Sequence, residues 1–200
     1  SKVRAGQTIR SGLRVKFDSF ETSRGSEAEN ITLFWQTMNH NLDSSFWNSK
    51  YKEQDTGWDL GETTPFFEHY INFIDKSKII CFPGAGYGHD PIFYAENGYK
   101  VYAIEYAQIA AMHMIKKNIN NLHVLNSDFF QIDKSYNNFF DIVIEYTFYC
   151  AFDPKLRNKY FDKIYNILRP GGEIIGLFLP INKDDLSGPT FKISLNEIKN

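Results

Sequence analysis

The residues with the clearest chemical potential are three glycines and an acid in the middle of the chain. Gly84, Gly86 and Gly88 follow a short apolar run and precede a segment with a helical pattern. Glycines at such a turn allow positive φ angles and let the backbone approach a ligand closely. Glu105 ends the next apolar run, about 20 residues later, where a carboxylate can accept hydrogen bonds from both hydroxyls of a ribose. Together these residues predict a binding site for a nucleoside cofactor.

The loop departs from two common phosphate-binding patterns. Its spacing, Gly-Ala-Gly-Tyr-Gly, lacks the third glycine of the dinucleotide fingerprint. No Gly-Lys-Ser/Thr follows, which excludes a P-loop for nucleoside triphosphates. The alternative for Glu105 is an exposed acid at a strand end, but the order of strand, loop, helix and strand favours a cofactor site.

Polar residues also end two later apolar runs. Asp128 can accept a hydrogen bond from an adenine amino group while Phe129 covers a ring face; the alternative is a helix-capping acid beside a core phenylalanine. Glu145 and Tyr146 end the fourth run, and an ionisable pair at this end of a parallel strand is more often functional than structural. Here the alternative is an ordinary exit from a strand into a loop.

These residues need a scaffold, and the chain predicts one in which strands and helices alternate. Continuous apolar runs predict strands that are buried on both faces, and the segments between them have helical spacing. The expected strands cover residues 78–83, 99–105, 122–128, 139–146 and 171–180, and the expected helices cover 90–98, 107–118 and 153–168. The pattern predicts an α/β fold whose parallel sheet has helices on both faces.

Three helix starts share one signal, an N-cap residue followed by proline at the first helical position. The pairs are Thr64-Pro65, Asp90-Pro91 and Asp153-Pro154. We therefore expect a helix to begin at each of these prolines.

Composition bounds the class of protein. The 200 residues fit one domain, and the net charge of −2, with 22 basic and 24 acidic residues, leaves no basic block for a nucleic acid. No apolar stretch approaches the ~20 residues of a membrane span. Cys81 and Cys150 lie in apolar runs, so we expect a cytoplasmic, reducing location and no disulfide framework. The five histidines are scattered, which predicts no metal site, and we interpret His89 as a structural hydrogen-bond donor.

An aromatic segment precedes the glycine-rich loop. Trp47 and Tyr51 are four residues apart and share one face of a helix, and Trp58 follows in a turn. The alternative is a helix that packs its aromatic side chains on the core. We call residues 46–64 the lead-in.

Five segments, taken in order, resemble the thiopurine S-methyltransferase superfamily. They are FWNSKYKEQDTGWDLGETTP, FPGAGYGHD, FDIVIEYTFYCAFDP, ILRPGGE and LSGPTFKIS, and they extend from Phe46 to about Ile193. The closer branch is that of the plant and bacterial thiol, halide and thiocyanate methyltransferases. The resemblance implies a Rossmann-like methyltransferase fold with S-adenosylmethionine as cofactor. It also implies methyl transfer to a small soft nucleophile, a thiol or sulfide, with a halide or thiocyanate as the neighbouring option.

The resemblance further implies where the cofactor contacts the chain. In that family the lead-in aromatics close over S-adenosylmethionine, which here implies Trp47, Tyr51 and Trp58. Gly84, with Gly86 beside it, would lie against the methionine end.

The strand-end residues take the other implied roles. Glu105 would hold the ribose, although many relatives have aspartate at this position. Asp128 and Phe129 match the pair that contacts the adenine. Tyr146, with Glu145, matches the segment where cofactor and acceptor meet, and both are candidate catalytic residues.

The chemistry of a sulfonium displacement agrees with these residue types. Aromatic faces attract a sulfonium through cation–π interaction, and a thiolate or halide needs no strong base. Catalysis can then rest on positioning and on exclusion of water. A segment with Gly188, Pro189 and Phe191 matches one that borders the acceptor pocket, where relatives often have two prolines and this chain has one.

Two other functions stay open. One is a non-catalytic module that binds S-adenosylmethionine, against which the retained aromatic and acceptor segments count. The other is an RNA or protein methyltransferase, which the absence of a basic block and of an Asn/Asp-Pro-Pro-Tyr motif disfavours.

We expect residues 1–200 to form a single domain with three parts. Residues 38–75 would hold the lead-in and the first helix, and residues 76–200 the cofactor-binding core. Relatives continue after the last resembling segment with two further strands, whereas here Arg14–Phe20 and Ile31–Gln36 predict two strands at the front, joined by a loop. Residues 1–37 could therefore be these last two strands in a circularly permuted order; the alternative is an N-terminal extension.

Overall fold

The computed structural model describes residues 15–22, 25–33, 42–179 and 189–199. By its internal contacts the chain divides into two compact units: the first is Ser1–Asn41 and the second is Leu42–Asn200.

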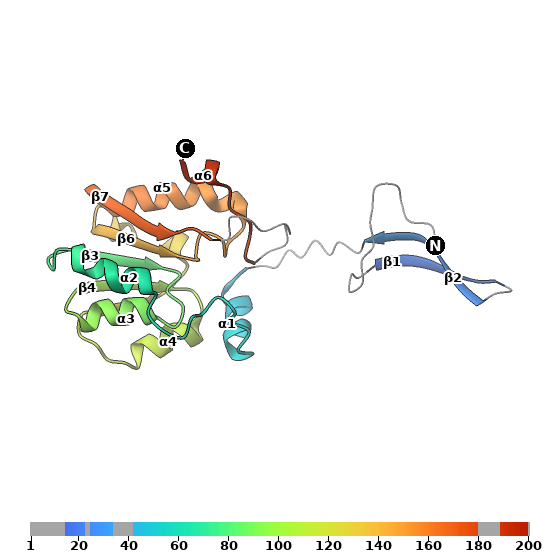
Figure 1. Cartoon of the computed structure of the whole chain (residues 1–200), viewed down its shortest axis with the longest axis horizontal. Coiled ribbons are helices and arrows are strands. Elements are labelled where there is room, and N and C mark those ends of the chain that lie inside the picture. Colours follow the sequence, from blue (N-terminus) through green and yellow to red (C-terminus); the bar gives the residue numbers. More distant parts are fainter. Residues whose placement is uncertain (1–14, 23–24, 34–41, 180–188, 200) are drawn as a thin grey trace. The chain divides into compact units, whose positions relative to one another are not determined.

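The first unit contains an antiparallel pair of strands, β1 (Val15–Thr22) and β2 (Gly25–Leu33), with Thr22 opposite Gly25 (Figure 1). Both strands expected near the front of the chain are therefore present. The second strand begins earlier than expected, because residues 25–30, which were expected in the joining loop, already belong to β2. The end of the second predicted strand, residues 34–36, lies outside the described residues. The circularly permuted order stays a prediction.

The second unit is built on a five-stranded parallel sheet with the strand order β5-β4-β3-β6-β7 (Figure 1). This sheet confirms the predicted α/β fold. The chain winds outward from β3 to β5 and then returns to β6 on the other side of β3. In open parallel sheets, ligands bind at the carboxyl ends of the strands where the winding reverses, which here means the ends of β3 and β6. The strands are β3 (Ile79–Pro83), β4 (Lys100–Glu105), β5 (Leu122–Asn126), β6 (Phe140–Tyr146) and β7 (Leu168–Leu177).

Helices precede, connect and follow these strands. One helix lies in the lead-in and another lies between it and β3. The connections between strands form three further helices together with several 3₁₀ turns, and a last helix follows β7. The α-helices are α1 (Ser44–Lys52), α2 (Pro65–Tyr70), α3 (His89–Glu96), α4 (Gln108–Ile115), α5 (Arg157–Ile167) and α6 (Leu195–Lys199). The 3₁₀ turns are η1 (Ile71–Phe73), η2 (Phe129–Gln131), η3 (Lys134–Tyr136) and η4 (Pro154–Leu156).

Alternate residues of the strands enter two separate cores, one on each face of the sheet. Ile80 and Phe82 of β3 pack in a cluster with Tyr94 of α3, and Phe67 of α2 belongs to the same cluster. Cys81, which lies between them in sequence, packs in the other cluster, which also contains Tyr160, Ile164 and Ile167 of α5. Burial on both faces explains why the strands read as unbroken apolar runs in the sequence.

The predicted helix starts are confirmed at two of the three prolines. Thr64 is the N-cap of α2, and Asp153 caps η4 by accepting a hydrogen bond from the backbone of Lys155. The prediction that Asp90 is an N-cap is wrong, because α3 begins one residue earlier with Gly88 as its N-cap. Asp90 lies in the first turn, and its carboxylate accepts hydrogen bonds from another segment.

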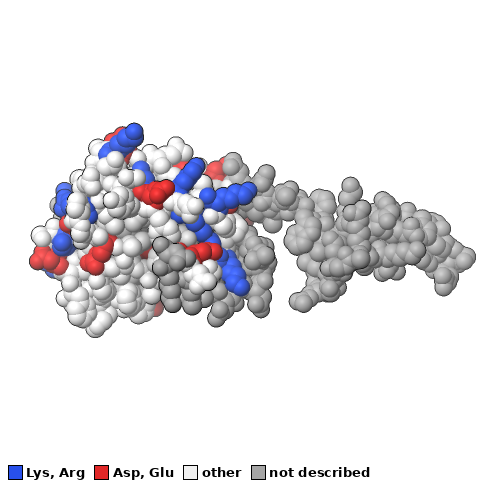
Figure 2. All heavy atoms as spheres, turned by 90° about the horizontal axis from the view of Figure 1, so that it is seen from above, with Lys and Arg blue, Asp and Glu red and all other residues white. Residues whose placement is uncertain are grey.

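The described residues also show the lengths of the helices, the state of the two cysteines and the distribution of surface charge. No helix among them is long and apolar enough to cross a membrane. Cys81 and Cys150 are both buried, and neither is in a disulfide. On the face in Figure 2, basic and acidic side chains are scattered among each other over the second unit.

Candidate active site

The glycine-rich loop after β3 has a backbone that only glycine adopts without strain. Gly84, Gly86 and Gly88 have φ angles of +61°, +57° and +84°. A Cβ atom on Gly84 would lie 2.2 Å from the ring of Phe148, in the turn that follows β6. The loop is therefore pressed against the carboxyl end of β6, at the reversal point of the sheet.

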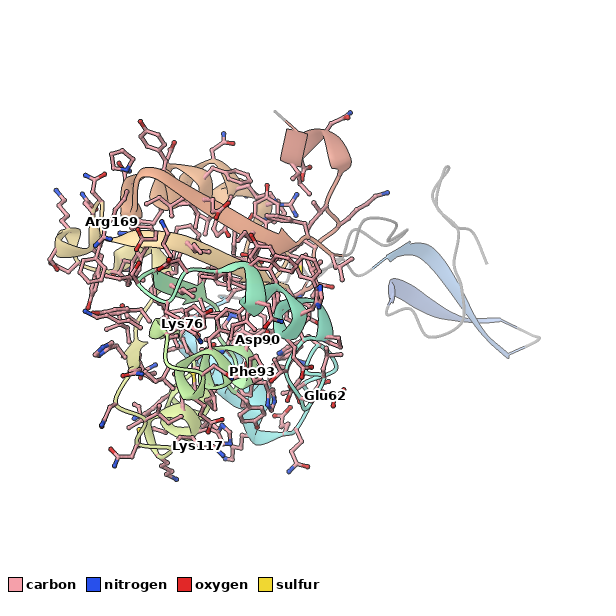
Figure 3. All side chains as sticks on the ribbon, turned by 60° about the vertical axis from the view of Figure 1, so that its left-hand side comes forward. Glu62, Lys76, Asp90, Phe93, Lys117 and Arg169 are labelled. Carbon is pink, nitrogen blue, oxygen red and sulfur yellow. The ribbon has the colours of Figure 1, made fainter. Side chains whose placement is uncertain are left out.

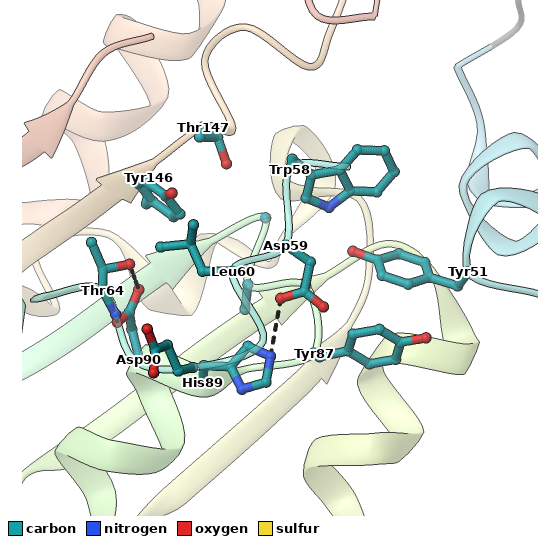
Figure 4. Close-up of a pocket in the computed structure, with 14 residues that line it drawn as sticks. Tyr51, Trp58, Asp59, Leu60, Thr64, Tyr87, His89, Asp90, Tyr146 and Thr147 are labelled. Carbon is teal, nitrogen blue, oxygen red and sulfur yellow. Dashed lines mark hydrogen bonds and ion pairs between the residues drawn. The ribbon is translucent and has the colours of Figure 1, made fainter. Parts of the chain in front are cut away.

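A cavity of about 60 Å³ lies at this junction (Figure 4). Its wall is formed by three segments: the lead-in, the glycine-rich loop with the first turn of α3, and the end of β6. Five of the residues proposed from the sequence line it: Tyr51, Trp58, Gly84, Gly86 and Tyr146. The other proposed residues do not line it: Trp47, Glu105, Asp128, Phe129 and Glu145.

The lead-in aromatics form a cluster beside the cavity. The ring of Tyr51 meets those of Trp58 and Tyr87 edge-on, with centroids 5.9 and 4.9 Å apart. Trp47 packs edge-on against Trp58 at 5.6 Å and supports the cluster from behind the cavity wall. The hydroxyl of Tyr51 would lie 3.2 Å from a Cβ atom on Gly86, so the cluster covers the loop closely. Burial and the nearby Glu105 raise the pKa of Tyr51, which keeps its phenol neutral.

Glu105, at the end of β4, joins this loop to the next one. One carboxylate oxygen accepts a hydrogen bond from the backbone of Gly86 and the other from that of Ala107, both at 2.7 Å. The side chain is buried, and desolvation raises its pKa to about 7, although the two backbone donors act in the opposite direction. Its carboxylate thus lies directly beneath the loop, where a bound ribose would be expected. The ribose contact itself is untested and stays a proposal.

Asp128 and Phe129 follow β5 in a different setting. Asp128 accepts hydrogen bonds from the backbone of Phe130 at 2.9 Å and from the side chain of Gln131 at 3.0 Å, and it caps the 3₁₀ turn η2. Phe129 is buried and packs against the rings of Phe148 and Tyr160. This is the geometry of a capping acid beside a core aromatic, and an adenine contact stays a proposal.

Glu145 is fully buried and supports the turn after β6. Its Oε1 atom accepts hydrogen bonds from the backbones of Phe148 and Tyr149 at 2.8 Å, and its Oε2 atom accepts one from the hydroxyl of Tyr160 at 2.6 Å. Within this turn Thr147 has a φ of +58°, which is strained for a β-branched residue. The geometry therefore points to a structural role for Glu145: it holds the turn that presents Tyr146 and Thr147 to the cavity.

Several polar residues in the cavity wall were not assigned a ligand role from the sequence, among them Asp59, Thr64, His89 and Asp90. The Asp90 carboxylate accepts hydrogen bonds from the backbone and the hydroxyl of Thr64, at 2.7 and 2.9 Å. Figure 3 shows Asp90 inside the unit and Glu62, another wall residue, at its edge. Asp59 lies 3.0 Å from the Nε2 atom of His89. These pairings join residues more than 25 positions apart, so local sequence patterns carry no signal for them.

The segment that is expected to border the acceptor pocket is described only in part. Gly188 lies outside the described residues. The backbone of Phe191 donates a hydrogen bond to the carbonyl of Cys150 at 2.7 Å, so this part of the segment lies against the turn after β6.

The residues present suit an adenosyl sulfonium. A glycine cradle that tolerates no Cβ, a cluster of aromatic faces and a buried acid under the loop are the groups that such a cofactor needs. Within the described residues, no group of three or more His, Cys, Asp or Glu side chains could hold a metal ion.

Comparison with known proteins supplies the family. A model of the thiopurine S-methyltransferase family matches residues 42–200. Probable thiol methyltransferase 2 of Arabidopsis thaliana is 30% identical over 172 residues, which cover 82% of this chain and 74% of that protein. Thiocyanate methyltransferase 1 of the same plant is 27% identical over 169 residues, covering 80% of this chain and 71% of that protein.

A solved structure supports the fold. The 1,6-didemethyltoxoflavin-N1-methyltransferase of Burkholderia thailandensis, with 1,6-didemethyltoxoflavin and S-adenosylhomocysteine bound, superposes with a TM-score of 0.59 at 16% identity. The match covers 84% of this chain and 70% of that one, and it confirms the Rossmann-like architecture. The chain is a methyltransferase that uses S-adenosylmethionine, and it belongs to the thiopurine S-methyltransferase family.

Proposed function

We propose that this enzyme methylates a small thiol or sulfide at the junction of β3 and β6. The observation that carries the proposal is the cavity wall there. It combines the glycine-rich loop with the aromatic faces of Trp58 and Tyr146. Aromatic faces beside such a loop suit a sulfonium methyl donor and a small soft acceptor.

S-adenosylmethionine supplies the methyl group, and the chain supplies position and a suitable environment. When bound, the cofactor would supply its sulfonium methyl group to the acceptor sulfur, with the thiol proton passing to water and S-adenosylhomocysteine left as the other product. Glu105 would orient the ribose beneath the loop. Trp58 and Tyr51 would cover the sulfonium and exclude water, and aromatic faces stabilise such a cation. Tyr146 would border the acceptor, with its phenol neutral because burial raises its pKa.

The charge of the wall favours a neutral thiol over an anion. Among the described lining residues are Asp59, Glu62 and Asp90, and none is a lysine or an arginine. An iodide or thiocyanate ion would meet these carboxylates, and the described wall offers it no lysine or arginine. Halide or thiocyanate transfer is therefore the second candidate, supported by the similarity to the plant thiocyanate methyltransferase.

An acceptor panel tests this function. The enzyme is incubated with methyl-labelled S-adenosylmethionine and with sulfide, methanethiol, an aryl thiol, iodide or thiocyanate. We expect labelled thioether from the thiols, with a kcat/KM at least about tenfold above that for the two anions, which corresponds to about 1.4 kcal/mol. A preference for the anions would assign the enzyme to the second candidate. Cofactor binding without product from any acceptor would support the non-catalytic module.

A further inference from the structure

The lead-in is joined to the start of α3 at two points, and neither has a role in the function proposed above. At the first, Oδ1 of Asp59 lies 3.0 Å from Nε2 of His89 (Figure 4). The same oxygen accepts a hydrogen bond from the backbone of Gly61 at 3.0 Å, which fixes the carboxylate on its own turn. At the second, Thr64 donates two hydrogen bonds to Asp90.

The two connections differ in exposure. Thr64 and Asp90 are both buried, and both carboxylate oxygens of Asp90 accept a hydrogen bond from Thr64. Asp59 and His89 are partly open to solvent, with side chains 19% and 30% exposed. The first connection is therefore the more exposed of the two, although the Nε2 atom of His89 is itself buried.

The more exposed connection is also the one next to Trp58. Asp59 follows Trp58 directly, and both line the cavity together with His89. A cofactor on the glycine-rich loop would therefore lie against Trp58, which the Asp59–His89 contact ties to the start of α3.

We propose that the Asp59–His89 pair is a latch that holds Trp58 over the bound cofactor. Both are positioning residues: they hold the lead-in against the start of α3, and Trp58 makes the contact. The latch opens to admit or release the cofactor, while the buried Thr64–Asp90 connection keeps the far end of the segment in place. The inference rests on the proposed placement of the cofactor at the glycine-rich loop.

The test is the rate at which the cofactor product leaves the enzyme. Stopped-flow tryptophan fluorescence follows dissociation of S-adenosylhomocysteine from the full chain and from Asp59→Asn, His89→Gln and the double variant. We expect each single variant to release the ligand about two- to fivefold faster, the scale of a partly exposed ion pair. The double variant should release it no faster than either single one, because the two residues act as a pair. Thermal unfolding confirms that each variant is folded.

A matched control lies in the same lead-in. Lys50 and Asp55 form a partly exposed ion pair at the end of α1, and neither lines the cavity. Asp55→Asn removes a carboxylate of the same kind and should leave the dissociation rate unchanged.

Three results would overturn the latch. Unchanged rates in both single variants would show that the pair holds nothing in place. Additive effects in the double variant would show that the residues act separately. A faster release of S-adenosylmethionine but not of S-adenosylhomocysteine from Asp59→Asn would show that Asp59 acts directly on the sulfonium charge. If the unmodified chain bound neither ligand, the proposed function would fail, whereas the three results above leave that function intact.

Discussion

Two buried glutamates lie at the carboxyl ends of β4 and β6, on either side of β3, and they accept hydrogen bonds from different parts of the molecule. Glu105 ends β4 and accepts hydrogen bonds from Gly86, in the glycine-rich loop, and from Ala107. Glu145 lies one residue before the end of β6 and accepts three, from Phe148, Tyr149 and Tyr160. Burial raises the pKa of each to about 7.

The comparison shows that an acid at a strand end can have either of two roles. The Glu145 side chain is fully buried, and one of its donors, the phenol of Tyr160, is a core group. Glu105 is 6% exposed, and one of its donors, the backbone N–H of Gly86, belongs to the glycine-rich loop. We therefore expect substitutions at Glu145 to lower stability and substitutions at Glu105 to lower cofactor affinity.

The largest expected effect is the loss of stability in Glu145→Ala. The variant leaves two backbone N–H groups and one phenol without an acceptor in a buried site, and it releases the strained turn at Thr147. Loss of a buried charged group of this kind costs about 3–5 kcal/mol. Urea unfolding measures it. Glu145→Gln is the matched control, since its amide oxygen can accept from both backbone N–H groups and its NH₂ group can donate to the hydroxyl oxygen of Tyr160; an equal loss in both variants would contradict the assigned role.

The next effect is a dependence of stability on pH. The folded-state pKa of Glu145 is raised from 4.5 to about 7, so the fold favours the protonated carboxyl. The stability that this group contributes is fully present below pH 4.5 and is lost as the pH rises to about 7. The full shift corresponds to about 3 kcal/mol. Unfolding of the wild type and of Glu145→Gln is compared across this range, and the stability of the wild type relative to the variant should fall as the pH rises. A constant difference would contradict the raised pKa.

A smaller loss is expected from Gly84→Ala, which acts where the two regions meet. The substitution forces a positive φ on alanine and places a Cβ atom 2.2 Å from the ring of Phe148, within the turn that Glu145 holds. We expect a loss of about 2 kcal/mol in unfolding free energy together with weaker cofactor binding. Gly57→Ala is the control, because a Cβ atom there meets nothing within 4 Å. Equal behaviour of the two variants would show that the loop does not need glycine at this position.

The smallest effect is expected from Tyr146→Phe. The hydroxyl borders the cavity but belongs to a neutral phenol, so it can orient a thiol but does not act as a strong base. We expect kcat for a thiol to fall about three- to tenfold while the affinity for S-adenosylhomocysteine stays the same, a loss of roughly one neutral hydrogen bond. Steady-state kinetics and calorimetry measure the two quantities. A loss of more than a hundredfold would make Tyr146 an essential catalytic group.

Local patterns in the sequence predict the scaffold well because they arise from local causes. The three central strands β3, β4 and β6 are buried on both faces, so each reads as a nearly unbroken apolar run, and the glycines of the loop mark positive φ angles. Tyr51, Trp58 and Tyr146, which the sequence marks by an aromatic lead-in and a strand end, line the same cavity as the glycine-rich loop. These features need no knowledge of distant contacts.

The features that sequence reasoning misses depend on distant contacts. The pattern Asp-Pro predicts an N-cap at Asp90, but the carboxylate accepts hydrogen bonds from Thr64, 26 residues earlier. Asp59 and His89 meet only when the lead-in folds over α3. Glu145 reads as a candidate catalytic acid until the positions of Phe148, Tyr149 and Tyr160 are known.

The most direct test of the whole picture is calorimetric titration with S-adenosylhomocysteine. Wild type, Glu105→Ala and Glu145→Gln are titrated under conditions in which all three are folded. If the cofactor lies on the glycine-rich loop with its ribose held by Glu105, the alanine variant binds about 10- to 100-fold more weakly, as expected for hydrogen bonds to a charged group, and Glu145→Gln binds like the wild type. Equal affinity of Glu105→Ala and wild type would contradict this placement of the cofactor.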